Sequence, residues 1–224
     1  SGAKQISIGK DRWLSDLFYE KFVKPNEKSF DLRQFNSFEA KLCGQDVYQS
    51  QENKPYFKYL KTDVDNEVIL VVTNLPQDQK ELVIPSKVQD ISGTSLKVVC
   101  VKSAVSLKNI EKVTFDGDFE QLEIMPFTFV DCARLSSVTL PKGTTSVGNG
   151  AFYNCKSLTI VKIPKGVTSI GYYAFAGCEK LANVTILDSV TSIGEGAFAG
   201  CETLKEVTIP GSVTSIGHRA FCGC

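Results

Sequence analysis

Residues 132–223 repeat one pattern every 23 residues, and this repeat constrains the fold more than any other feature of the sequence. The four copies are "CARLSSVTLPKGTTSVGNGAFYN", "CKSLTIVKIPKGVTSIGYYAFAG", "CEKLANVTILDSVTSIGEGAFAG" and "CETLKEVTIPGSVTSIGHRAFCG". A fixed interval of about 20–50 residues is typical of a solenoid, because each unit buries its apolar edge only by stacking on the next unit. We call one such unit a rung.

Each rung carries two short extended stretches. The V-x-I piece, as in Val184 and Ile186, has the two-residue period of a strand, and in three rungs a proline follows it and ends it. The "TSIG" piece is a second extended run, whose glycine indicates a close approach that a Cβ would obstruct. Stacked rungs place equivalent side chains about 4.8 Å apart, so two apolar columns are expected. The phenylalanine column is Phe129, Phe152, Phe175, Phe198 and Phe221, and the leucine column is Leu135, Leu158, Leu181 and Leu204.

Looser rungs precede the regular ones. Ile110, Val113 and Phe115 fill the L-x-x-V-x-I places of one rung, and Ile124 with Phe129 fill the I-G-x-x-A-F places that follow. Further back, "LVIP" at 82–85 begins another rung, and about eight inserted residues separate it from Val99 in the isoleucine place.

The repeat resembles the BspA-like class of leucine-rich repeats, whose unit is L-x-x-V/I-x-I/L-P-x-x-V/T-x-x-I-G-x-x-A-F-x-x-C. The resemblance covers residues 132–224 closely and extends back to about residue 80. It implies a right-handed leucine-rich-repeat solenoid with short parallel strands and mostly β rungs. Residues 56–88 are similar to the β-rich lead-in of bacterial members, in which a strand pair precedes the first "IP".

The first 55 residues show a different pattern. In "DRWLSDLFYEKFV" (11–23) and "FDLRQFNSFEAKL" (30–42) the apolar residues recur at helical spacing, which predicts two amphipathic helices. We therefore divide the chain into a helical segment at 1–55 and a solenoid at 56–224, with a lead-in and degenerate rung at 56–109 and regular rungs at 110–224. The overall class is α+β. Residues 1–55 are expected to cap the solenoid, or else to form a separate binding module.

The sequence starts with "SGAKQ" and stops at Cys224, inside a rung that lacks its strand. The start suggests a trimmed chain, so the sequence neither shows nor excludes a removed export signal. The end suggests that the natural protein continues, or that this rung self-associates with another copy.

Five of the eight cysteines follow the 23-residue spacing, and they are Cys132, Cys155, Cys178, Cys201 and Cys224. Equivalent side chains in stacked rungs point in parallel, not toward each other, so we expect buried thiols and not a disulfide framework. Cys224 and the nearby Cys222, which falls outside the spacing, are expected to be exposed. They stand as C-x-C without the second pair that a zinc site needs, so no metal site is predicted.

No catalytic residues and no cofactor are predicted. His218, the only histidine, occupies a variable place, and the sequence lacks a phosphate-binding loop or a metalloprotease motif. The 25 basic and 25 acidic residues cancel, which gives no field for nucleic acid, and no apolar run is long enough for membrane insertion.

A binding surface is the remaining prediction. Residues that flank the inward valine of each rung face outward, and solenoids use the concave strand face for extended binding. The predicted binding residues are Lys112, Thr114, Ser137, Thr139, Ile160, Lys162, Asn183, Thr185, Glu206 and Thr208. A threonine-rich row is also what β-propensity alone produces on a solvated strand. Tyr172 and Tyr173 form a second candidate patch, at a corner.

The leading hypothesis is a non-enzymatic binding protein that presents its solenoid to a protein, such as one of the host or the extracellular matrix, or to a glycan. The family resemblance implies adhesion at the cell surface or in the extracellular space. One alternative is a polysaccharide-active enzyme built on parallel β rungs, and another is an intracellular scaffold or effector, which the reduced thiols favour.

Overall fold

Stacked strands dominate the structure, a computed structural model that describes residues 48–49, 56–62, 64–73, 75–90, 92–103 and 107–224. Within these residues the chain forms strands and turns and no helix. The two predicted helices, at 11–23 and 30–42, lie outside the described residues, so they and the boundary at residue 55 stay predictions.

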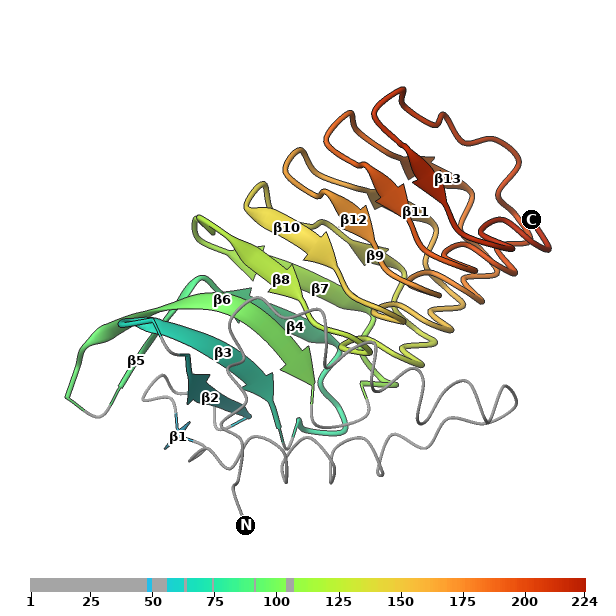
Figure 1. Ribbon diagram of the computed structural model, residues 1–224. Helices are drawn as coiled ribbons and strands as arrows, with labels where there is room; N and C mark the ends of the chain where they lie inside the picture. Colours follow the sequence, from blue (N-terminus) through green and yellow to red (C-terminus); the bar gives the residue numbers. More distant parts are fainter. Residues whose placement is uncertain (1–47, 50–55, 63, 74, 91, 104–106) are drawn as a thin grey trace, which may run out of the picture.

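The larger sheet has ten strands, which pair in the order β1-β2-β3-β6-β8-β10-β12-β14-β15, with β5 beside β6 (Figure 1). The antiparallel lead-in is β1 (Tyr48–Gln49), β2 (Phe57–Lys61) and β3 (Glu67–Val72), followed by the hairpin of β5 (Lys87–Gln89) and β6 (Ser95–Ser103). The remaining strands, parallel to β6, are β8 (Leu122–Ile124), β10 (Thr144–Val147), β12 (Ser169–Ile170), β14 (Ser192–Ile193) and β15 (Ser215–Ile216).

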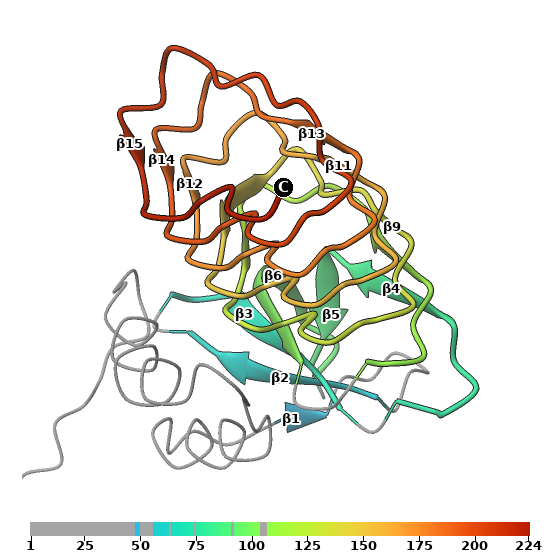
Figure 2. The same ribbon diagram turned by 90° about the vertical axis from the view of Figure 1, so that its right-hand side faces the viewer.

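The smaller sheet has five parallel strands in the order β13-β11-β9-β7-β4. They are β4 (Glu81–Pro85), β7 (Lys112–Asp116), β9 (Ser137–Val138), β11 (Ile160–Lys162) and β13 (Asn183–Thr185). Figure 2 shows the two sheets on opposite sides of the coil, and each rung up to the one with β13 and β14 contributes one strand to each sheet.

The register of the strands confirms the 23-residue rung. Ser169 lies opposite Ser192 and Ile170 opposite Ile193 in one sheet, while Val161 lies opposite Val184 in the other. Each pair is one repeat apart in sequence. The predicted solenoid of short parallel strands is therefore confirmed.

The phenylalanine column is confirmed as well. Successive rings from Phe129 to Phe221 are stacked with centroids 5.1, 5.2, 5.3 and 5.3 Å apart. All are fully buried except Phe221, which is partly buried. The leucines of the second column are likewise buried, so the two columns form the spine of the core.

The glycine of "TSIG" is needed for close approach of the backbones. A Cβ on Gly171 would lie 2.6 Å from the backbone nitrogen of Asn149, and one on Gly194 would lie 2.6 Å from the backbone of the preceding rung. The turn before the phenylalanine has a different requirement, a left-handed backbone. This position is Phe127, Gly150, Tyr173, Gly196 and Arg219 in successive rungs, all with φ between 52° and 57°, and the ring of Tyr173 fills the space beside Gly196.

The internal cysteines are buried free thiols, as predicted. The Cys178 Sγ lies 3.3 Å from the carbonyl oxygen of Phe152, to which it donates, and Cys155 and Cys201 make the same contact with Phe129 and Phe175. Burial raises the pKa of the Cys155 thiol well above its ordinary value. Cys222 and Cys224 are exposed.

The lead-in strand pair is confirmed, but the predicted place of the insertion is wrong. β2 and β3 pair antiparallel before the first "IP", as the resemblance implied. The residue opposite Ile124 in the next strand is Val101, not Val99. The inserted residues form the β5–β6 hairpin, in which Val88 pairs with Leu96, and the length of a hairpin loop is not fixed by the repeat.

Candidate functional site

The outer face of the five-stranded sheet is formed by the residues on either side of the inward valines. Val113, Val138 and Val161 point into the core and are 1–5% exposed. Side chains alternate between the two faces of a strand, so their neighbours point outward. Nine of the ten predicted binding residues are exposed, and Thr114 is partly buried.

Strand register brings most of these residues into two rows that run across the rungs. The first outer row consists of Glu81, Lys112, Ser137, Ile160 and Asn183, which lie opposite one another in successive strands. The second outer row consists of Val83, Thr114, Thr139, Lys162 and Thr185, with Thr139 one residue past the end of β9. Successive residues within a row are therefore separated by the distance between neighbouring strands, about 4.8 Å.

Glu206 and Thr208 do not extend these rows as strand residues. Both are exposed, but residues 206–208 form no strand, and β13 is the last strand of the sheet. The rung that contains them pairs on one side only, and its sole strand is β15 in the other sheet. One-sided pairing supplies half of the ladder hydrogen bonds of an internal strand.

Ile160 stands out in the first outer row because it is a large aliphatic residue with 49% of its surface exposed. Its register neighbours are the small polar Ser137 and Asn183. Lys162 stands beside it in the second row and has no hydrogen-bond or ion-pair partner among the residues that the structure describes. An exposed apolar side chain with polar side chains around it has the arrangement of apolar centre and polar rim that protein interfaces show.

Lys112 differs from Lys162. Its Nζ lies 2.8 Å from Oε1 of Glu81, directly opposite on β4. Glu81 and Val83 were not among the predicted binding residues, although the alignment of "LVIP" with the next rung places both in the outer rows.

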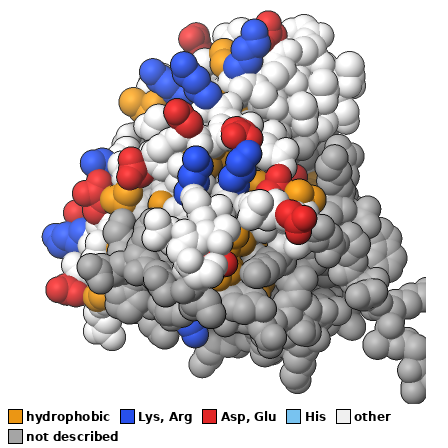
Figure 3. Space-filling view, turned by 90° about the vertical axis from the view of Figure 1, so that its left-hand side faces the viewer, with side chains coloured by type: hydrophobic (Ala, Val, Ile, Leu, Met, Phe, Trp, Pro, Cys, Tyr) orange, Lys and Arg blue, Asp and Glu red, His pale blue; other side chains and the backbone are white. Residues whose placement is uncertain are grey.

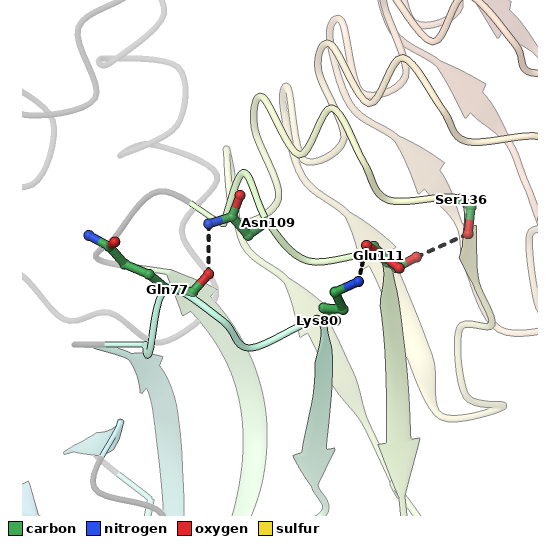
Figure 4. A network of polar contacts seen from close by, with 5 residues as sticks. All are labelled: Gln77, Lys80, Asn109, Glu111 and Ser136. Atoms are coloured by element: carbon green, nitrogen blue, oxygen red, sulfur yellow. Dashed lines mark hydrogen bonds and ion pairs between the residues drawn. The ribbon is translucent and has the colours of Figure 1, made fainter.

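A network of polar contacts borders the rows where β4, β7 and β9 begin (Figure 4). The Lys80 Nζ lies 3.2 Å from Oε1 of Glu111, and the Ser136 Oγ donates to the carbonyl oxygen of Glu111 at 3.1 Å. Nearby, Asn109 donates to the carbonyl oxygen of Gln77 at 2.8 Å. These contacts join neighbouring rungs and hold the start of the strands in register.

Charges of both signs alternate over the surface. Figure 3 shows basic and acidic side chains interspersed on one face. Lys97 and Glu120 form an ion pair of 2.7 Å, and its hydrogen bond lowers the pKa of the Glu120 carboxyl. Lys156 and Glu179 form another, and the bond raises the pKa of the Lys156 ammonium. The described side chains in Figure 3 gather into no extended basic patch of the kind that binds a nucleic-acid backbone.

The corner tyrosines differ in exposure. Tyr172 is 40% exposed, whereas Tyr173 is partly buried, and its hydroxyl lies 3.3 Å from Oε1 of Glu195. Tyr173 is held against the next rung beside Gly196, which gives it a structural role. Only Tyr172 of the predicted pair presents an open aromatic surface.

The described residues give little basis for catalysis. His218 is exposed at a corner, and no group of three or more histidine, cysteine or acidic side chains in the described part of the chain is arranged to hold a metal ion. Nor does any helix within these residues have both the length and the apolar character to cross a bilayer.

The repeat region matches a known family. The family described as "BspA type Leucine rich repeat region" matches residues 122–224 in six copies. No curated protein matches the chain.

Several solved structures are similar. A leucine-rich cell surface protein from Faecalibacterium prausnitzii is 25% identical, with a TM-score of 0.60 over 80% of this chain and 52% of that one. A leucine-rich repeat protein from Bacteroides ovatus is 27% identical, with a TM-score of 0.55 over 74% of this chain and 37% of that one. A T. pallidum leucine-rich repeat protein is 25% identical, with a TM-score of 0.59 over 79% and 89%. The chain thus spans about half of the first of these proteins and about a third of the second.

Proposed function

Since residues 122–224 are a BspA-type leucine-rich repeat region, we propose that this chain is a non-enzymatic binding module of a secreted or cell-surface protein. Its ligand is another protein, and it binds across the outer rows of the five-stranded sheet. The similarity to a protein described as a cell surface protein supports the location. Rigid stacking of the rungs supports the mode of binding, because a preorganised surface loses little entropy on association.

The observation that carries the proposal is the exposure of Ile160. At 49% exposure it lies between the polar Ser137 and Asn183 in the first outer row, and beside it lies Lys162, which has no ion-pair partner in the described part of the chain. Interface hot spots combine a central apolar or aromatic anchor with a polar rim that excludes water. Neither side chain belongs to a hydrophobic cluster of the described residues, so both are available to a ligand.

The role of the remaining row residues follows from their position. Asn183, Thr185, Ser137 and Thr139 supply short polar groups around the anchor, and Lys112 supplies a charge already paired to Glu81. Glu206 and Thr208 lie beyond the last strand of the sheet, so we assign them to the rim of the surface.

The test is recovery of partners from immobilised extracellular-matrix proteins of a host. We compare the wild type with two variants, Ile160→Asp and the double variant Lys162→Glu/Asn183→Arg. The matched control is Ser169→Glu/Ser192→Arg, which makes the same kind of change on the outer face of the ten-stranded sheet. We expect both five-sheet variants to lose a specific partner by roughly tenfold or more, the loss typical of a hot spot, while the control keeps it.

Equal recovery of a specific partner by all three variants would remove this face from consideration. Recovery of a glycan in place of a protein, with the same dependence on Lys162 and Asn183, would keep the face and replace the class of ligand.

A further inference from the structure

The outer face of the ten-stranded sheet changes character from one end to the other. One row in register crosses eight of its strands, from β2 to β15, and it is made of Leu60, Ile69, Cys100, Glu123, Ser146, Ser169, Ser192 and Ser215. The last four positions are serine and the first three are apolar. Stacking of the strands does not by itself require serine or an apolar residue at this place, because the same row contains both kinds.

The apolar end of this row belongs to a hydrophobic cluster separate from the main core. Along β3, Val68, Leu70 and Val72 pack in the main core, whereas Ile69 and Val71 join Leu60 in the second cluster. The partly buried Cys100 and Met125 pack against that cluster. Because side chains alternate along a strand, the two clusters lie on opposite faces of the sheet.

The second cluster is closed to solvent. Leu60, Ile69 and Val71 are only 2–5% exposed. Burial raises the pKa of the Cys100 thiol to about 12, with smaller contributions from Glu123 and Glu67. The strands that carry the cluster include the parallel pair β3 and β6, and parallel sheets are covered on both faces. This end of the sheet therefore needs a covering layer.

The chain itself contains a segment that suits this face. Residues 11–23 place Trp13, Leu14, Leu17, Phe18 and Phe22 on one side at helical spacing, which gives a broad apolar stripe. The chain joins the sheet at β1, where Tyr48 pairs with Tyr59 and Gln49 with Lys58 on the strand that carries Leu60. Only residues 24–47 separate the segment from β1, so covalent linkage gives it a high effective concentration near the apolar face.

We propose that residues 11–23 dock as an amphipathic helix on the face formed by Leu60, Ile69, Val71, Cys100 and Met125. The serine end of the row needs no such cover, since Ser146, Ser169 and Ser192 are partly exposed and Ser215 is exposed.

Trp13 is the only tryptophan of the chain, so its fluorescence reports directly on docking. The sheet-side variant is Ile69→Glu, and its matched control is Ser169→Glu in the same row. The segment-side variant is Leu17→Glu, with Asp16→Lys on the polar side of the same stretch as its control. We expect blue-shifted emission in the wild type and both controls, and red-shifted, more readily quenched emission in Ile69→Glu and Leu17→Glu.

The second readout is the reactivity of Cys100 in a background in which Cys43, Cys222 and Cys224 are serine. Docking shields this thiol, so Leu17→Glu should speed its labelling by roughly tenfold or more, because labelling then no longer waits for local opening. Leu17→Glu leaves the sheet residues unchanged, so it decides the outcome even if Ile69→Glu unfolds the sheet.

The proposal is overturned if Trp13 of the wild type emits like a solvated tryptophan, or if Cys100 is labelled equally fast in the wild type and Leu17→Glu. It is also overturned if the blue shift disappears on dilution, since that result assigns the cover to a second copy of the chain.

Discussion

The rungs at 155–177 and 201–223 share most of their sequence, including "VTSIG", yet the same letters lie in different surroundings. Phe175 is fully buried, whereas Phe221 is only partly buried. Ile170 is 2% exposed, whereas Ile216 is 50% exposed. The side chains that differ are those that need a rung stacked on their far side.

Other residues of the rung at 201–223 keep the surroundings of their counterparts. A Cβ on Gly217 would meet the backbone of Glu195 in the preceding rung, as one on Gly171 would meet Asn149. Cys224 directly follows this rung, as Cys178 follows the rung at 155–177. Its Sγ lies 3.3 Å from the carbonyl oxygen of Phe198, the same contact that Cys178 makes with Phe152. The comparison therefore separates contacts made to the preceding rung from contacts made to the following one.

The phenylalanine column gives the largest expected difference. Phe175→Ala should lower the free energy of unfolding by about 3–5 kcal/mol, because a fully buried ring leaves a cavity between two stacked neighbours. Phe221→Ala should lower it by less than half as much, since Phe221 stacks on Phe198 alone. Urea unfolding of both variants measures the difference, and equal losses would contradict the role assigned to the following rung.

The glycines provide the converse test. Gly171→Ala and Gly217→Ala should each destabilise the protein by about 1–3 kcal/mol, the range for a side chain forced into filled space. Their losses should be similar, because both contacts are to the preceding rung. Gly211→Ala is the control, since a Cβ there meets nothing within 4 Å. A neutral Gly217→Ala would show that the backbones separate easily at that rung.

The cysteine column should give a smaller effect. Cys178→Ala removes a buried thiol and its donation to the Phe152 carbonyl, which still accepts from the Cys155 N–H, and we expect a loss of about 1–2 kcal/mol for the lost hydrogen bond and packing contacts. Cys224→Ala should have less effect because Cys224 is exposed. Thermal unfolding measures both. Labelling with a thiol reagent before unfolding should modify Cys222 and Cys224 and leave Cys178 unmodified.

Glu123 should give the smallest effect, and one that depends on pH. Burial raises the pKa of its carboxyl in the folded protein, so the folded state favours the protonated form. The stabilisation by protonation is fully present below the ordinary glutamate pKa of about 4.3 and is lost as the pH rises through the raised value.

Glu123→Gln should therefore be slightly more stable than the wild type at pH 7 and equally stable at low pH. Unfolding curves at several pH values test this. Glu120→Gln is the control, and it should not show that gain, because the hydrogen bond to Lys97 lowers the pKa of the Glu120 carboxyl. A constant difference between Glu123→Gln and the wild type at all pH values would contradict the desolvation of this carboxyl.

The regular rungs were predictable because four copies of the repeat carry the same residue types at the same places. Strand positions, the phenylalanine column and the buried thiols all follow from which side chains recur at the same place. The β5–β6 hairpin was not predictable in detail, since Val101 and not Val99 pairs with Ile124 across an insertion outside the repeat. The ion pair of Lys112 with Glu81 also depended on a register that only the folded sheet fixes.

The outward residues of the five-stranded sheet show the same limit. Their exposure could be predicted from alternation with the inward valines, but the difference between the paired Lys112 and the unpartnered Lys162 could not, because the two lysines stand in similar sequences. Thr208 illustrates a second limit, since its rung matches the pattern and still forms no strand in that sheet.

The sequence by itself determined the period of the stack, the identity of its apolar spine and the faces on which polar residues lie, because these depend only on spacing along one chain. The tertiary structure alone decided which rungs bury their side chains completely, which charges pair and how one face changes from leucine and isoleucine to serine across eight strands. The physical reason is that burial and pairing require a neighbour, and the neighbours here come from rungs at least 23 residues away.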